Sequence, residues 1–227
     1  MRMMCHRQGR GVWQGVLLSG LICLLASCAP SHQDLRKSEG YYREGLANLT
    51  TDRQRAFVSF QKAVQLNPDN KDAHYGLGHI YAQQGKYREA EAEFRQVLRL
   101  DEEHSATHTY LGQILASQGR LDEAIAEYRL ALANPLYETP DLARFHLGRA
   151  LVKTGDMKAA VGAFEDAALV NPPNISPALL NLELGRAYLG LGFDQRAKET
   201  LQKVAAMDNG GEYGVAATEL LKNMKEY

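Results

Sequence analysis

Cysteine is scarce in this sequence of 227 residues. Its three copies, Cys5, Cys23 and Cys28, all lie near the N-terminus. A mature form that begins at Cys28 therefore keeps one cysteine and can form no internal disulfide. Cysteine-based redox chemistry and cysteine metal sites are excluded for such a form.

Charged side chains are missing between positions 11 and 33, directly after a basic start. The first ten residues contain three arginines and no acid, and the strongly apolar run at 16–26 has only eleven residues. A membrane-spanning helix needs about 20. A basic start before a short apolar run is typical of a cleaved secretion signal. The alternative, an uncleaved membrane anchor, is disfavoured because the run is short.

The sequence also lacks an excess of positive charge, with 26 basic against 27 acidic residues. Loss of the three arginines in the first ten residues would leave 23 against 27, a formal charge of −4. Nucleic acid is therefore not an expected partner. The chain has no glycine-rich phosphate loop and no nucleophile elbow, so we expect no small-molecule substrate.

Of the seven histidines, only His104 and His108 have a spacing that suggests a metal site. This pair lacks the intervening glutamate and the third ligand of a zinc hydrolase. His74 lies 34 residues before His108, at the same position of the repeat described below, so helix packing explains both residues better. We expect no catalytic residue, no metal and no cofactor. A metal-dependent enzyme that uses His104 and His108 is the alternative.

A repeat of 34 to 37 residues runs through most of the chain. Each copy has a glycine, an alanine twelve residues later and a large apolar residue four further on: Gly78, Ala90 and Phe94; Gly112, Ala124 and Tyr128; Gly148, Ala160 and Phe164; Gly185, Ala197 and Leu201. A second glycine lies between the first two positions, at Gly85, Gly119, Gly155 and Gly192. Glycine allows the chain to turn sharply between two helices. Each copy is therefore predicted to be a helical hairpin.

This pattern resembles the tetratricopeptide (TPR) repeat, roughly over residues 37–209. The resemblance implies an all-α fold: a right-handed TPR superhelix, or α-solenoid, of about five helix-turn-helix repeats plus a C-terminal capping helix. The first repeat is irregular, since Gly45 comes eleven residues before its alanine and residues 48–52 replace the turn glycine. We expect a distorted hairpin there. The proline-rich junctions at 134–140 and 171–177 are either plain helix stops or functional breaks.

The motif Leu25-Ala26-Ser27-Cys28 resembles the lipobox of bacterial lipoproteins. That resemblance implies cleavage before Cys28 and acylation of this cysteine, which would anchor the protein to a membrane by lipid alone. Position 29 is alanine rather than aspartate. In Gram-negative lipoproteins aspartate there marks inner-membrane retention, so the resemblance implies the outer membrane. Residues 29–34 are short and polar, as expected of a tether.

These features together predict the organisation of the chain. Its expected parts are a signal peptide at 1–27, the lipidated cysteine and tether at 28–36, TPR 1 at 37–70, TPR 2 at 71–104, TPR 3 at 105–140, TPR 4 at 141–177, TPR 5 at 178–211 and a capping helix at 212–227. Residues 213–225 are amphipathic, as a helix that covers the last apolar face should be. Half of a degenerate sixth repeat is the alternative.

The first helices of the hairpins are expected to line the concave face of the superhelix, where TPR proteins usually bind ligands. Counting along the repeat, the inward positions are Tyr42, Tyr75, His79, Gln83, Thr109, Gln113, Ser117, Phe145, Arg149, Lys153, Leu182 and Arg186. Aromatic residues and amides give way to three cations toward the C-terminus. This surface suits an extended peptide or partner helix that carries acidic groups. The lysine and asparagine set of chaperone-binding TPRs is missing.

The lipobox, the short tether and the Leu-Tyr-x-x-Pro break at 136–140 together resemble the PilF/PilW family of type IV pilus biogenesis lipoproteins. The resemblance implies a non-catalytic scaffold on the periplasmic face of the outer membrane that helps a secretin subunit reach that membrane and assemble. That family typically has six repeats, whereas this chain has five and a terminal helix. The alternative is a TPR adaptor for other envelope complexes, such as cell-wall hydrolases.

Overall fold

The computed structural model describes residues 29–224, which form eleven α-helices and no β-strand. Their bounds are α1 His32–Asn48, α2 Arg53–Leu66, α3 Lys71–Gln83, α4 Tyr87–Leu100, α5 Ser105–Ser117, α6 Leu121–Ala133, α7 Pro140–Thr154, α8 Met157–Ala168, α9 Pro177–Gly190, α10 Asp194–Met207 and α11 Glu212–Asn223. The expected signal peptide and Cys28 lie outside the described residues. None of these eleven helices combines the length and the apolarity needed to cross a membrane.

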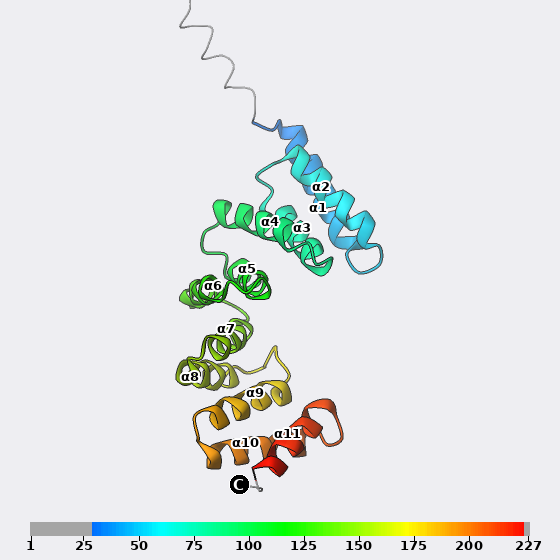
Figure 1. The fold of residues 1–227 in the computed structure, drawn as a ribbon. Helices are drawn as coiled ribbons and strands as arrows, with labels where there is room; N and C mark the ends of the chain where they lie inside the picture. Colours follow the sequence, from blue (N-terminus) through cyan, green and yellow to red (C-terminus); the bar gives the residue numbers. More distant parts are fainter. Residues whose placement is uncertain (1–28, 225–227) are drawn as a thin grey trace, which may run out of the picture.

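Ten of the helices form five antiparallel hairpins that stack one on the next into a curved solenoid (Figure 1). Each first helix, α1, α3, α5, α7 and α9, packs against the second helix that follows it and against the neighbouring hairpins. The first helices line the concave side, and α4, α6, α8 and α10 lie on the outer side (Figure 1). The predicted all-α TPR superhelix is confirmed.

The repeated glycines hold the two helices of each hairpin close together. A Cβ atom on Gly78 would lie 2.6 Å from the Phe94 ring, and one on Gly148 would lie 2.5 Å from the Phe164 ring. Both rings are fully buried. Such distances are shorter than any ordinary carbon contact, so the glycine is what allows the large side chain of the second helix to fill the interface.

The predicted turn glycines have left-handed backbone conformations. Gly85, Gly119, Gly155 and Gly192 have φ between 72° and 89°. Residues with a side chain rarely adopt this region, which explains the glycine at each turn. At the other ends of the hairpins, Pro140 and Pro177 are the first residues of α7 and α9. These junction prolines therefore begin helices, a position that needs no backbone N–H.

The N-terminal end differs from the expected layout in one respect. Helix α1 begins at His32, so part of the tether predicted at 28–36 is helical. The cause is a capping box: the Ser31 hydroxyl accepts from the Asp34 backbone N–H, and the Asp34 carboxylate accepts from the Ser31 backbone N–H. The irregular first hairpin departs from the others mainly in its turn, because Gly45 still packs directly against the Phe60 ring.

Helix α11 closes the C-terminal end of the array. It packs against α9 and α10, as the first helix of a further hairpin would (Figure 1). Its Ala217 is fully buried in a cluster with Leu201 and Val204 of α10. The Asp208 carboxylate accepts hydrogen bonds from the backbone N–H groups of Tyr213 and Gly214, which fixes the start of the helix. The last apolar face of the solenoid is thereby covered.

Candidate protein-binding groove

The concave face holds most of the predicted groove residues at the surface. Nine of the twelve are exposed or partly exposed, namely Tyr42, Tyr75, His79, Gln83, Gln113, Ser117, Arg149, Lys153 and Arg186. They come from all five first helices, so the predicted set follows the whole length of the groove.

Three of the predicted residues are buried instead. Thr109, Phe145 and Leu182 keep only 2%, 4% and 3% of their surface exposed. All three occupy the same position of the repeat, three residues before the glycine of the first helix, and their side chains are buried in the packing between helices. The Thr109 hydroxyl, for example, donates to the Ser105 carbonyl and lies 2.9 Å from the Tyr137 hydroxyl. These residues support the groove from beneath and do not line it.

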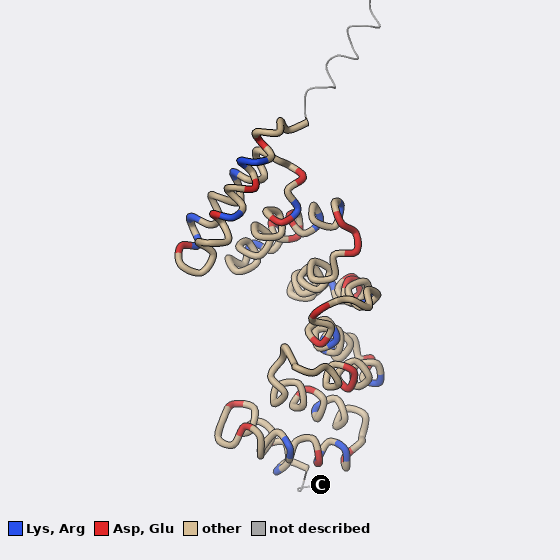
Figure 2. The backbone as a smooth tube through the Cα atoms, turned by 180° about the vertical axis from the view of Figure 1, so that it is seen from behind, with Lys and Arg blue, Asp and Glu red and all other residues tan. Residues whose placement is uncertain are grey.

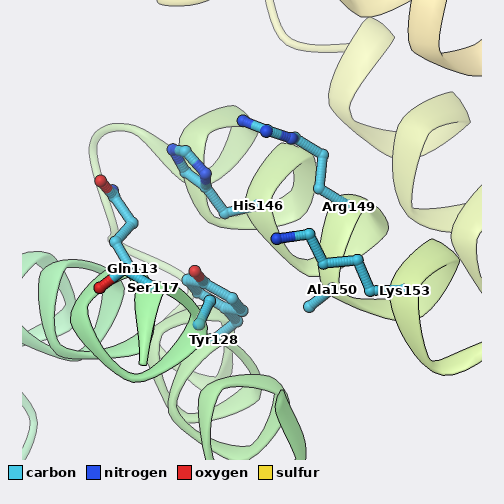
Figure 3. A pocket seen from close by; sticks show the side chains of 8 residues that line it. Gln113, Ser117, Tyr128, His146, Arg149, Ala150 and Lys153 are labelled. Atoms are coloured by element: carbon cyan, nitrogen blue, oxygen red, sulfur yellow. The ribbon is translucent and has the colours of Figure 1, made fainter. Parts of the chain in front are cut away.

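A cleft of about 240 Å³ lies between α5 and α7 (Figure 3). Helix α5 contributes Gln113, Ala116 and Ser117, helix α7 contributes His146, Arg149, Ala150 and Lys153, and Tyr128 of α6 is also in its lining. Four predicted groove residues, Gln113, Ser117, Arg149 and Lys153, are therefore brought together from two repeats. The side chains face one another across the cleft (Figure 3).

The cleft carries the positive charges of Arg149 and Lys153. Neither Arg149 nor Lys153 belongs to any of the ion pairs formed among residues 29–224. The Arg149 guanidinium carbon lies 5.7 Å from the centre of the Phe145 ring, which supports it by a cation–π contact. Basic and acidic residues are interspersed along the whole solenoid (Figure 2).

His146 and Tyr128 are two lining residues that sequence reasoning missed. The His146 ring stacks on the Tyr128 ring at 6.0 Å and meets the Phe145 ring edge-on at 5.4 Å. Burial, together with the positive charge of Arg149, lowers the pKa of His146 to about 4. Its imidazole is therefore neutral near pH 7 and offers a hydrogen-bond donor and an acceptor. His146, Arg149 and Lys153 are spaced i, i+3, i+7, and this helical stripe was the signal that could have revealed the histidine.

The groove has a different character between α3 and α5. The His79 ring lies between two tyrosine rings, 4.5 Å from Tyr75 and 4.1 Å from Tyr110, in edge-on contacts. Burial lowers the pKa of His79 to about 4, so this ring is also neutral near pH 7. The groove therefore changes from aromatic at its second and third repeats to cationic at its third and fourth.

The histidine pair that suggested a metal site is used for structure. His104 is the N-cap of α5, where its Nδ1 accepts from the Thr107 backbone N–H at 3.2 Å. The two ring nitrogens of His108 lie 2.6 Å from a Glu127 carboxylate oxygen and 2.8 Å from the Glu102 carbonyl oxygen. Within residues 29–224, no group of three or more His, Cys, Asp or Glu side chains is arranged to hold a metal ion.

Comparison with known families gives the class of the protein. Two family models described as tetratricopeptide repeat match residues 75–141 and 143–174, and one described as TPR repeat matches residues 54–85. Together they span more than half of the chain. The chain belongs to the tetratricopeptide repeat proteins, whose repeats are typically protein-interaction modules.

Solved structures extend the likeness over most of the solenoid, and two of them are the proteins PilF and PilW that the chain resembles. PilF of Pseudomonas aeruginosa is 19% identical with a TM-score of 0.67, covering 85% of this chain and 93% of that one. PilW, described as a widely conserved type IV pilus biogenesis factor, is 19% identical with a TM-score of 0.56, covering 80% and 98%.

The TPR protein YrrB, described as having an unusual peptide-binding site, is a third similar structure. It is 23% identical with a TM-score of 0.65, and the match covers 79% of this chain and 90% of that one. At these identities the likeness establishes the fold. No curated protein matches the chain in sequence.

Proposed function

We propose that this protein is a lipid-anchored scaffold that assists type IV pilus biogenesis by helping a secretin subunit reach the outer membrane and assemble there. The anchor is Cys28, which is acylated and becomes the N-terminal residue when residues 1–27 are removed, and the protein acts on the periplasmic face of that membrane. The binding surface is the concave face of the five hairpins. No catalytic step is part of this function.

The observation that carries the proposal is the likeness to PilF and PilW along nearly their whole length. The match includes 93% and 98% of those chains, and since the TPR protein YrrB matches over a similar share, this likeness supports the fold that the proposed role requires. The sequence adds a lipobox at Leu25–Cys28 and the Leu-Tyr-x-x-Pro break before α7. A scaffold for cell-wall hydrolases would need the same fold and anchor, so the Leu-Tyr-x-x-Pro break is the feature that favours the pilus role.

The groove is suited to bind an extended segment of a partner protein. Its walls are first helices of successive hairpins, each fixed to its own second helix by a buried aromatic or aliphatic side chain. A rigid surface of this kind loses little conformational freedom on binding, so more of the contact energy appears as affinity. Such a surface could hold a secretin subunit before it assembles into a ring.

The test is a deletion of the gene in its host, followed by measurement of heat-resistant secretin multimers in outer-membrane fractions. The deletion strain is complemented with wild type, with Cys28→Ala and with Cys23→Ala. The last variant is a matched control, because it removes a cysteine from the same leader and leaves the lipobox cysteine in place. Immunoblots of the fractions follow the protein itself.

We expect the multimers to disappear on deletion and to return with wild type and Cys23→Ala, whereas Cys28→Ala should not restore them. Multimers that persist in the deletion strain would contradict the pilus role, and cross-linking through the groove would then identify the partner. Full restoration by Cys28→Ala would contradict the lipid anchor.

A further inference from the structure

The cleft between α5 and α7 brings together donors that match an anion. Arg149 and Lys153 lie on successive turns of α7, and Gln113 and Ser117 face them from α5 (Figure 3). Within residues 29–224 the two cations are outside every ion pair, although eleven such pairs are formed elsewhere. No acidic side chain lines the cleft.

We propose that this cleft binds the carboxylate of an aspartate or glutamate side chain in an extended segment of the partner protein. The inference rests on the proposed function only in taking the concave face as the binding surface. Arg149 provides a planar pair of N–H donors that suits a carboxylate, and Lys153 adds a second charge beside it. Gln113 and the neutral His146 can donate to the remaining oxygen lone pairs.

The position of the cleft favours a side chain over a chain terminus. It lies between the third and fourth of five hairpins, so the groove continues past it in both directions (Figure 1). On one side are Tyr75 and Tyr110, and on the other side is Arg186 of α9. A segment that follows the groove therefore enters and leaves the cleft as continuous backbone, and only a side chain can reach inward.

The size of the cleft fits the same ligand. About 240 Å³ accommodates a carboxylate with its methylene groups and a few waters, and it is below the roughly 300–1,000 Å³ of typical small-molecule pockets. The partly exposed His146 ring, stacked on the buried Tyr128 ring, gives the methylene groups an apolar surface. A carboxylate in this setting is partly shielded from water, which strengthens its attraction to the two cations.

The test is a peptide selection that needs no knowledge of the natural partner. Short random segments are displayed between two fixed linkers, so that no free terminus is offered, and are selected on the full-length chain purified in detergent. Selection is repeated on Arg149→Gln/Lys153→Gln and on the control Arg129→Gln/Lys158→Gln. The control removes the same charge from exposed residues of the second helices α6 and α8, and thermal melts verify that both variants fold.

We expect wild type and the control to select segments rich in aspartate and glutamate, and the cleft variant to lose this preference. For the best selected peptide, fluorescence anisotropy should show a Kd for the cleft variant that is at least roughly tenfold higher than for wild type. Replacing the acidic residue of the peptide by the matching amide should raise the Kd for wild type by a similar factor. Charge reversal by Arg149→Glu/Lys153→Glu should select lysine and arginine instead.

Absence of an acidic preference in wild type, or its survival in the cleft variant, would overturn the inference. A second display presents the same segments with a free C-terminus. If binding then requires the C-terminal carboxylate and not an acidic side chain, the inference would also be overturned. Because the library contains no secretin sequence, this result is independent of the secretin assay. If secretin multimers persist in the deletion strain while acidic peptides still bind through the cleft, the pilus role is contradicted and the carboxylate site is supported.

Discussion

His74 and His108 make the same two side-chain contacts in successive repeats. In each case Nδ1 lies 2.6 Å from a carboxylate oxygen of the second helix, Glu93 or Glu127. Nε2 lies 2.9 or 2.8 Å from a backbone carbonyl of the loop before the first helix. A carbonyl oxygen can only accept, and an ionised carboxylate can only accept. Both ring nitrogens therefore donate, and the charged imidazolium is the form that the fold holds.

This arrangement determines the direction of the pKa shift. Burial of His74 lowers its pKa, but the hydrogen bond to Glu93, the contact with the Pro68 carbonyl and the charge of Glu93 outweigh burial, so the pKa is raised. A folded-state pKa above the unfolded value, about 6.5, stabilises the protein fully below the unfolded value. The contribution is lost as pH rises through the raised pKa.

We predict that Glu93→Gln lowers the free energy of unfolding at pH 6.5 and that its difference from wild type narrows toward pH 9. The reason is that only the protonated His74 gains from the ionised Glu93. Urea denaturation at several pH values measures the difference. Glu89→Gln, an exposed change in the same helix α4, is the control and should show a small difference that does not vary in this way.

A gap between wild type and Glu93→Gln that stays constant with pH would contradict the charged pair. The pH range begins at 6.5, which is about the unfolded pKa of histidine, because the contribution of His74 no longer grows below it, whereas His79 then lowers the stability of both proteins alike. Burial lowers the pKa of His79 to about 4, so the fold disfavours its protonation and loses stability as pH falls from 6.5 toward 4.

At the scale of the helical hairpin, the glycine of each first helix sets the distance between the two helices. Gly112 lies so close to Tyr128 that an added Cβ atom would be 2.6 Å from the ring. Gly162 of α8 is also helical but would have no heavy atom within 4 Å of an added Cβ. The two glycines therefore provide opposite tests of the same substitution.

We predict that Gly112→Ala lowers the free energy of unfolding by about 1–3 kcal/mol, because the buried Tyr128 ring must move. Gly162→Ala should raise it by about 0.5–1 kcal/mol, since alanine is the better helix former and meets no obstacle. Thermal and denaturant unfolding of both variants checks this pair. A stabilised Gly112→Ala variant would show that the hairpin tolerates a wider spacing.

The hairpins could be predicted from sequence because their geometry constrains residue type. Close helix contact excludes a side chain at Gly78, and the left-handed turn disfavours one at Gly85. Both constraints therefore produce a glycine that can be recognised in the sequence. The start of α1 was harder to predict from the sequence. Residues 32–34 are polar and carry no apolar periodicity, and the helix there depends on the capping box of Ser31 and Asp34.

The groove was less predictable, because repeat position does not determine exposure. The repeat pattern correctly predicted Arg149 and Lys153 as groove residues, but it also predicted Thr109, Phe145 and Leu182 there, and these three are buried. Whether such a side chain faces solvent depends on the neighbouring hairpin. Tyr128 illustrates the same limit, since it was recognised only as a core residue although it also lines the cleft.

At the scale of the whole molecule, a solenoid must cover the apolar face at each end of its array. Each hairpin contacts mainly its neighbours, so the last one has a face with no further repeat to bury it. Helix α11 covers that face through Ala217, which is fully buried, whereas Val215 on the same helix is 49% exposed. The two positions differ in burial by a wide margin within one turn.

We predict that Ala217→Asp separates α11 from α10 and lowers the stability of the protein by several kcal/mol, because an unpaired carboxylate would be buried against Leu201 and Val204. Val215→Asp adds the same charge at an exposed position and should change stability by less than about 0.5 kcal/mol. Denaturant unfolding measures both, and the binding of a dye that reports exposed apolar surface should rise for Ala217→Asp alone. Equal effects of the two variants would mean that the terminal helix does not hold the end of the superhelix closed, and the solubility of the array would then require another cover over α9 and α10.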